Sequence, residues 1–271
     1  MTSPDPSVGS LIREWRQRRH FSQLGLALEA EISQKHLSFV ESGRSVPSRA
    51  MVLRLAEQLE IPLRERNALL VTAGFAPVYR SRAADDPEME AARAAVALIL
   101  AGHEPNPALA IDRHWTLVSA NRAVAHLLAG VDPELLRPPV NVLRLSLHPG
   151  GLGPRIGNFR QWRAHILARL GRQIENSADP GLMALRDDLK AFPVPSGARP
   201  HRSGSEGALG GVAMPLELVT DFGRLSFIST TTVFGTALEI SLSELAIESF
   251  FPADRETALV MRRLGESAEM E

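Results

Sequence analysis

Two polar residues, Gln34 and Lys35, stand at the start of a short amphipathic segment, and the aromatic Phe39 follows one turn later. A glutamine amide can form two hydrogen bonds with adenine, a lysine can reach O6 or N7 of guanine, and an aromatic edge can pack on a thymine methyl group. At about 100° per residue, Leu37 and Val40 point to the opposite side. A helix that buries Leu37 and Val40 would therefore present the polar residues to the major groove of DNA.

Candidate phosphate contacts flank this segment. Gln23 follows Ser22, a predicted helix N-cap, and the backbone N–H groups at a helix N-terminus attract anions. Arg44 and Arg49 lie in the turn after the segment and are expected to bind phosphates, contacts that position a protein on DNA without reading its sequence. The complete set of expected DNA contacts is Gln23, Ser33, Gln34, Lys35, Ser38, Phe39, Arg44 and Arg49.

Five short helices are predicted to position these residues, because apolar residues recur at helical spacing between punctuating residues. The predicted starts and stops are the N-cap serines Ser22, Ser33 and Ser48, the opening Pro62, and the terminating Gly43 and Gly74. We expect an all-α domain at residues 1–76. We also expect a linker at residues 77–88, because this stretch is polar and flanked by prolines, and a second domain at 89–271.

These landmarks resemble the Xre-type (phage-repressor-like) transcriptional regulators. The residues that carry the resemblance are Leu11–Arg19, Ser22-Gln23, Leu26-Ala27, Ile32-Ser33, Glu41-Ser42-Gly43-Arg44 and Pro47-Ser48. The resemblance implies a five-helix, lambda-repressor-like fold with a helix-turn-helix that binds double-stranded DNA. From the logic of operators read by such domains, we also expect a homodimer on an operator of two-fold symmetry.

The family pattern further implies an ion pair between Arg16 and Glu41, which would link the first helix to the recognition helix. Gly25 departs from the pattern, since a better helix former is usual there, at a cost of roughly 1 kcal/mol of helix propensity. Some domains of this type bind protein instead of DNA, and that alternative stays open at this point.

Charge is distributed unevenly along the chain. The whole chain has a formal net charge of −1, but residues 1–82 contain 12 Lys and Arg against 8 Asp and Glu, a net of +4. Residues 83–271 contain 18 against 23, a net of −5. A basic first part on an acidic remainder is typical of a nucleic-acid-binding domain joined to a different kind of domain.

The second part of the chain mixes helices with strands. Helices are expected at 89–101, 121–129, 159–176, 180–191 and 254–264, and two short strands within 108–120. Residues 212–220 and 225–234 predict a hairpin because they are rich in β-branched and aromatic residues, and 193–211 predict an exposed loop. We expect an α+β domain with a mixed sheet of about five strands and helices on one side.

This part resembles the ligand-binding domain of the MmyB-like regulators, which follows an Xre-type module and has a PAS-like fold. The matching stretches are Arg113-His114-Trp115 with Val118, Ala120–Ala123, Asn141–Arg144, Phe227–Gly235, Ser243–Ala246 and Phe250–Asp254. The resemblance implies a sensor pocket, and fatty-acid-like ligands are associated with this fold family.

Aromatic residues are the expected lining of such a pocket, with a polar anchor beside them. The candidate ligand-binding residues are Trp115, Asn121, Arg122, Phe159, Trp162 and Phe227. Each aromatic residue could instead be ordinary core, and Asn121 could cap the helix that follows it.

Several other functions are excluded or lack support. The chain has no cysteine, which removes disulfides, thiolate metal sites and cysteine nucleophiles. The eight histidines show no metal-ligand spacing, and the glycine-rich run at 150–153 matches neither GxGxxG nor a P-loop. Ser203–Gly207 lacks the first glycine of a nucleophile elbow. We therefore expect no enzyme, no metal and no cofactor other than a bound apolar ligand.

The longest apolar run is far shorter than the roughly 20 residues of a membrane span, and no secretory signal is present, so a cytoplasmic protein is expected. The leading hypothesis is a one-component transcriptional regulator that senses a small apolar metabolite. The alternative is a DNA-binding regulator whose C-terminal domain only dimerises or binds a protein partner.

Overall fold

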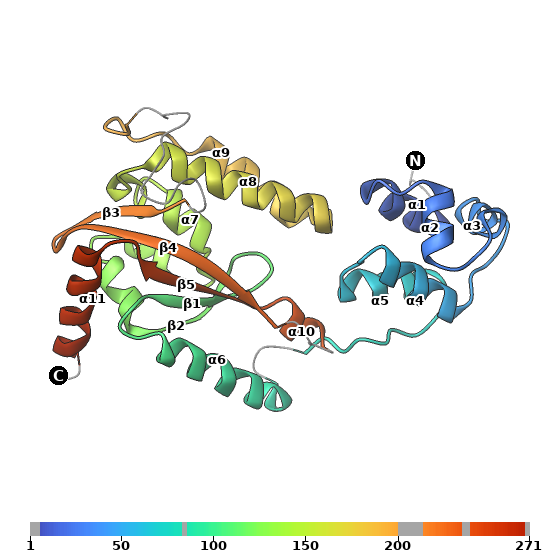
Figure 1. The fold of residues 1–271 in the computed structure, drawn as a ribbon, viewed down its shortest axis with the longest axis horizontal. Helices are drawn as coiled ribbons and strands as arrows, with labels where there is room; N and C mark the ends of the chain where they lie inside the picture. Colours follow the sequence, from blue (N-terminus) through green and yellow to red (C-terminus); the bar gives the residue numbers. More distant parts are fainter. Residues whose placement is uncertain (1–5, 83–85, 200–213, 235–238, 269–271) are drawn as a thin grey trace. The chain divides into compact units, whose positions relative to one another are not determined.

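The computed structural model describes residues 6–82, 86–199, 214–234 and 239–268, and its ribbon is shown in Figure 1. The chain divides into two compact units, one formed mainly by residues before 85 and one mainly by later residues. The predicted boundaries, with a linker at residues 77–88, stay a prediction.

The first unit contains the five predicted helices. They are α1 (Val8–Arg18), α2 (Gln23–Glu29), α3 (Gln34–Glu41), α4 (Arg49–Gln58) and α5 (Leu63–Thr72). The side chains of Ser22, Ser33 and Ser48 accept hydrogen bonds from backbone N–H groups in the first turns of α2, α3 and α4, as the N-cap pattern predicted. Gly43 and Gly74 follow α3 and α5 with positive φ angles of 73° and 82°, which glycine adopts without strain. The lambda-repressor-like, all-α fold is confirmed.

One apolar core holds these helices together, with Ile12, Leu26, Leu37 and Leu55 fully buried. Helices α1 and α3 approach each other closely at Gly9, where an added Cβ atom would lie 2.1 Å from the carbonyl oxygen of Val40. Only glycine fits at that position without displacing backbone.

The second unit is an α+β domain, as predicted. Its strands are β1 (Ala108–Ile111), β2 (Leu117–Ala120), β3 (Leu216–Thr220), β4 (Gly223–Val233) and β5 (Ala246–Pro252). Its α-helices are α6 (Glu90–Gly102), α7 (Val142–Leu147), α8 (Phe159–Ser177), α9 (Pro180–Ala191) and α11 (Arg255–Ala268). Short 3-10 turns lie at Pro87–Met89, Arg122–Leu127, Pro133–Leu136 and Gly153–Arg155. The one-turn helix α10 (Ile240–Ser243) is grouped with the first unit.

Within the described residues the five strands form one sheet in the order β2-β1-β5-β4-β3, and every neighbouring pair is antiparallel. The expectation of a mixed sheet was therefore wrong. The sequence prediction also contained no strand at β5, although this strand lies at the centre of the sheet. The helix predicted at 121–129 is a 3-10 turn, and most of the loop predicted at 193–211 lies outside the described residues.

Helices lie on both faces of the sheet (Figure 1), so the expectation of helices on one side was also wrong. Val96 and Leu100 of α6 pack with Ala108, Ala110 and Ile247 on one face. Helices α7, α8 and α9 cover the other face, and their apolar residues form the larger core. Because side chains alternate along a strand, Ile247 points to α6 whereas Glu248, the next residue of β5, points to the other side. No helix in the described part of the chain is long and apolar enough to span a bilayer.

Candidate functional site

Helix α3 presents the predicted base-reading residues on its outer side. Leu37 and Val40 are buried against the helical core, whereas Gln34 and Lys35 are exposed in the first turn of the helix. Phe39 is half-buried, and the cationic groups of Lys35 and Arg44 lie 5.8 and 6.0 Å from the centre of its ring. The predicted division between a buried and an outward face is therefore present, and base reading itself stays a prediction.

The remaining DNA candidates surround α3. Ser33 caps the helix, Ser38 is half-buried, and Arg44 and Arg49 are exposed on either side of the turn that leads into α4. Gln23 is half-buried, and its amide donates a hydrogen bond of 2.8 Å to Oε2 of Glu41. That bond orients the Gln23 side chain at the start of α2.

Glu41 also accepts two hydrogen bonds from Arg16. Arg16 Nε lies 2.6 Å from Oε1 and Nη2 lies 2.9 Å from Oε2. Both side chains are buried, and Arg16 Nη1 donates to the carbonyl of Phe21 at 2.8 Å. The pair that the family resemblance implied thus joins α1, the start of α2 and the end of α3.

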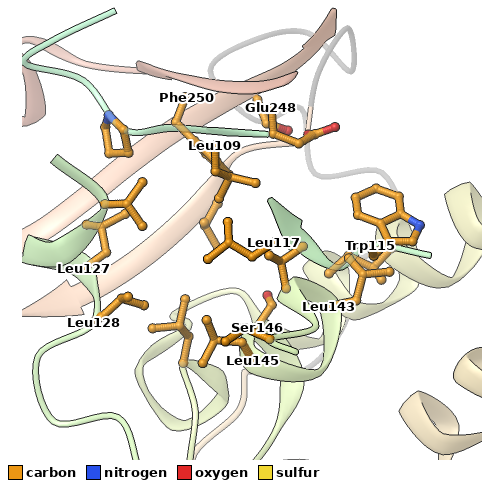
Figure 2. A pocket seen from close by; sticks show the side chains of 18 of the residues that line it. Leu109, Trp115, Leu117, Leu127, Leu128, Leu143, Leu145, Ser146, Glu248 and Phe250 are labelled. Atoms are coloured by element: carbon orange, nitrogen blue, oxygen red, sulfur yellow. The ribbon is translucent and has the colours of Figure 1, made fainter. Parts of the chain in front are cut away.

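The second unit contains a cavity of about 320 Å³ between the sheet and helices α7 and α8. Leucines from several elements surround it, as Figure 2 shows. Its lining is Pro107, Leu109, Trp115, Leu117, Val124, Leu127, Leu128, Leu136, Val140, Val142, Leu143, Leu145, Ser146, Leu152, Trp162, His165, Ile166, Arg169, Leu216, Ser229, Glu248 and Phe250. Of the six candidate ligand residues, the structure brings only Trp115 and Trp162 to this cavity.

The other four candidates do not line this cavity, and their role in ligand binding stays a prediction. Phe159 and Phe227 are fully buried in the core, because they pack against neighbouring side chains rather than border a space. Asn121 binds backbone groups, accepting from Ala108 N at 3.0 Å and donating to the carbonyls of Leu100 and Asn106. Its side chain does not cap the 3-10 turn that follows.

Arg122 is exposed near Glu104, with its Nε 3.8 Å from Glu104 Oε1. It borders a separate, more polar depression beside α11. The polar anchor of the cavity is therefore not at residues 121–122.

The charged groups of the cavity come from α8 and β5. Arg169 donates through Nη1 to Oε2 of Glu248 at 3.0 Å and through Nη2 to Oε1 at 2.5 Å. Thr231 Oγ1 accepts from Arg169 Nη2 at 2.6 Å and donates to Glu248 Oε1 at 2.8 Å. Sequence reasoning missed this pair, although a glutamate inside the short apolar run at 245–252 is an unusual residue that marks the position.

Trp115 lies at the same side of the cavity as Glu248 (Figure 2), and several contacts hold it there. Its φ angle is +67°, which is strained for a bulky residue. The guanidinium of Arg169 lies 4.5 Å from the centre of the Trp115 ring, and Trp115 Nε1 donates a hydrogen bond to Oε1 of Gln173 at 2.8 Å. Asp112 Oδ1 accepts from the backbone N–H groups of His114 and Thr116, which stabilises the loop on both sides of Trp115. A strained residue persists only where its surroundings hold it in this way.

His165 stacks on Trp162 with ring centres 5.6 Å apart. Burial lowers the pKa of the His165 imidazole, and the charges of Arg169 and Arg172 lower it further against the opposing effect of Glu248. The neutral imidazole is therefore favoured at this wall of the cavity.

Comparison with known families assigns both units. Residues 92–264 match the family of the MmyB-like transcription regulator ligand binding domain, which covers more than half of the chain. The chain belongs to the MmyB-like transcription regulators. Residues 12–66 of this MmyB-like regulator match a helix-turn-helix family. It is a DNA-binding transcriptional regulator with a ligand-binding domain, and the cavity lies inside that domain.

Comparison of the MmyB-like regulator with curated proteins gives no match. Among solved structures, it aligns with an RNA-binding Light-Oxygen-Voltage receptor at 12% identity and a TM-score of 0.26. The alignment covers 97% of this chain and 63% of that receptor. In the described parts of the regulator, no group of three or more His, Asp or Glu side chains is arranged to hold a metal ion.

Proposed function

We propose that this MmyB-like regulator binds a two-fold operator as a homodimer and responds to a small, mainly apolar metabolite in the α7–α8 cavity. The observation that carries the proposal is the cavity itself, about 320 Å³ of space lined mostly by leucine, valine and tryptophan. Folded interiors are close-packed and leave few voids larger than a water molecule. A cavity of this size and lining is what a small-molecule site requires.

The lining supports a ligand with a hydrocarbon chain. Leu109, Leu117, Leu127, Leu143 and Leu145 come from four elements, β1, β2, the 3-10 turn at Arg122–Leu127 and α7, and they converge on one space (Figure 2). Burial of each methylene group of a ligand against such a wall is favourable by about 0.8 kcal/mol. A molecule with a long alkyl or acyl chain, as in the fatty-acid-like ligands that the family resemblance implied, is the ligand class that we propose.

DNA reading is assigned to α3. Gln34, Lys35 and Phe39 would reach base edges, and Arg44 and Arg49 would bind the flanking phosphates. Two heads in a dimer would read half-sites about 34–36 Å apart, or a multiple of that distance. Because an operator-binding regulator acts on the chromosome, we also propose a cytoplasmic location.

Ligand binding would then shift the regulator between two arrangements of its DNA-reading heads. Such a shift requires that the ligand bind one arrangement more tightly than the other. By linkage, operator DNA must change the affinity for the ligand by the same factor.

Two measurements on the full-length protein test this function. The first is selection of bound sequences from a random DNA pool, where we expect an enriched, two-fold symmetric motif. The second is organic extraction and mass spectrometry of the purified protein, where we expect a co-purifying alkyl or acyl compound that changes operator affinity when added back. A pool without an enriched motif would refute DNA reading. A protein that binds no alkyl compound would favour a C-terminal domain that only dimerises or binds a protein partner.

A further inference from the structure

We infer that the cavity selects an alkyl ligand with an uncharged, hydrogen-bonding head group, such as an alcohol or an amide, over a free carboxylate. The inference rests on the proposed function and adds the chemistry of the head group. It follows from the Arg169–Glu248 pair, which supplies the two charged side chains of a mostly apolar wall.

The pair is neutral as a unit. Among the described residues that line the cavity, Arg169 is the only arginine or lysine and Glu248 is the only acid. The guanidinium binds both carboxylate oxygens, and Thr231 bridges the two side chains. The positive charge that would attract a ligand carboxylate is thus already matched inside the protein.

Glu248 cannot easily give up its partner. The residue is 4% exposed and lies in the central strand β5, between Leu109 of β1 and Thr231 of β4. A ligand carboxylate that took Arg169 would leave Glu248 buried without a counter-charge, which is strongly unfavourable. A carboxylate that bound beside the intact pair would place a second negative charge near Glu248 in surroundings of low polarity.

The remaining polar groups of the wall suit a neutral head group. Ser229 pairs with Phe250 across the β4–β5 ladder, so it faces the same side of the sheet as Thr231 two residues later. Its hydroxyl can donate and accept, as can a neutral imidazole at His165. An alcohol or amide can bond to these groups without adding charge.

The test measures displacement of the uncharged dye Nile red from the full-length protein by ligands of one chain length. Dodecanol, dodecanamide and dodecanoate are compared at about pH 8, where a free carboxyl group is ionised. We expect dodecanol and dodecanamide to bind at least about tenfold more tightly than dodecanoate, since a neighbouring like charge is worth one or more powers of ten.

The variant Glu248→Gln removes the negative charge and frees Arg169 for a ligand. We expect its affinity for dodecanoate to rise about tenfold or more relative to dodecanol. The matched control is Glu217→Gln, because Glu217 lies on β3 outside the cavity, 3.7 Å from Arg224. This control should leave the ratio unchanged. The doubly neutral variant Arg169→Gln with Glu248→Gln should keep the preference for dodecanol.

The wild-type ratio decides the inference even if a variant fails to fold. Tighter binding of dodecanoate than of dodecanol by the wild-type protein overturns the head-group inference and leaves the proposed function intact. An unchanged ratio in a folded Glu248→Gln variant also overturns it. If none of the three compounds displaces the dye, the proposed function is overturned together with the inference.

Discussion

Arg16 on α1 and Glu41 on α3 form a bidentate ion pair in the interior of the helical unit, with N–O distances of 2.6 and 2.9 Å. The pair joins the first helix to the last residue of the recognition helix, and Gln23 adds a third hydrogen bond from α2. A polar contact between residues 25 positions apart thus ties α3 to α1.

Removing one member of this pair should destabilise the helical unit strongly. We expect Arg16→Ala to lower the free energy of unfolding by about 3–5 kcal/mol, because Glu41 would be left buried without a counter-charge. Urea denaturation measures the change. Arg18→Ala is the matched control, since its ion pair with the exposed Glu14 should be worth less than about 1 kcal/mol. Equal decreases in the free energy of unfolding for the two variants would contradict the stabilising role of the Arg16–Glu41 pair.

Base reading and phosphate binding can be separated by two substitutions. Gln34→Ala should lose discrimination at one base position by about 1–3 kcal/mol, because Gln34 is exposed at the start of α3. Arg44→Ala should weaken binding to all sequences alike and reduce the dependence of affinity on salt. Titration of the selected operator and its single-base variants at several salt concentrations measures both effects. The assignment of Gln34 fails if its variant weakens every sequence equally.

Filling the cavity should block the ligand without unfolding the domain. Val142 borders the cavity, so Val142→Phe can place its ring in existing space and should abolish binding of alkyl compounds. Val131 is buried away from the cavity, so Val131→Phe should overpack the core and cost about 1–3 kcal/mol of stability. Dye displacement and thermal unfolding of both variants check this contrast. Normal ligand binding by a stable Val142→Phe protein would place the site elsewhere.

Two glycines in helices should respond oppositely to alanine. Gly9→Ala should destabilise the helical unit by roughly 1–3 kcal/mol, because the new Cβ would meet the backbone of Val40. Gly171 lies within α8, and an added Cβ atom there meets no atom within 4 Å. Gly171→Ala should therefore stabilise the protein by about 0.5–1 kcal/mol, by helix propensity and a less flexible unfolded chain. Denaturant midpoints of the two variants test the opposite signs.

Acid should destabilise the ligand-binding domain through His165. Burial, with help from Arg169 and Arg172, holds the pKa of His165 below its ordinary value of about 6.5. As pH falls through about 6.5, the unfolded chain binds this proton before the folded protein does. The contribution of neutral His165 to the free energy of unfolding is therefore fully present above about pH 6.5 and is lost progressively below it. Urea midpoints between about pH 5 and pH 8 should fall less on acidification in His165→Gln than in the wild type. Parallel pH profiles for the two proteins would count against this role.

The helical unit was predictable because its determinants are local. Serine caps, a proline opening and terminating glycines act within one turn of each helix, and they lie where the sequence placed them. The outer face of α3 followed from the 3.6-residue period, which places Leu37 and Val40 on the buried side. The Arg16–Glu41 pair was also predicted, but from the family resemblance and not from the spacing of the two residues.

The ligand cavity was only partly predictable. Trp162 and Phe159 lie three residues apart on α8 and are equally plausible from their residue type, yet one lines the cavity and the other is fully buried in core. Hydrophobicity shows that a side chain leaves water, but it does not show whether a space remains beside it. Shape complementarity among distant elements decides that.

By itself, the sequence determined the two kinds of domain and the outer face of α3, because capping, periodicity and charge are properties of neighbouring residues. Only the tertiary structure decided the chemistry of the cavity. Arg169 and Glu248 are 79 positions apart and meet because the antiparallel order of the sheet places β5 at its centre, facing α8. Contacts of that separation depend on how strands pair and which face each residue takes, and a single sequence carries no local signal for either.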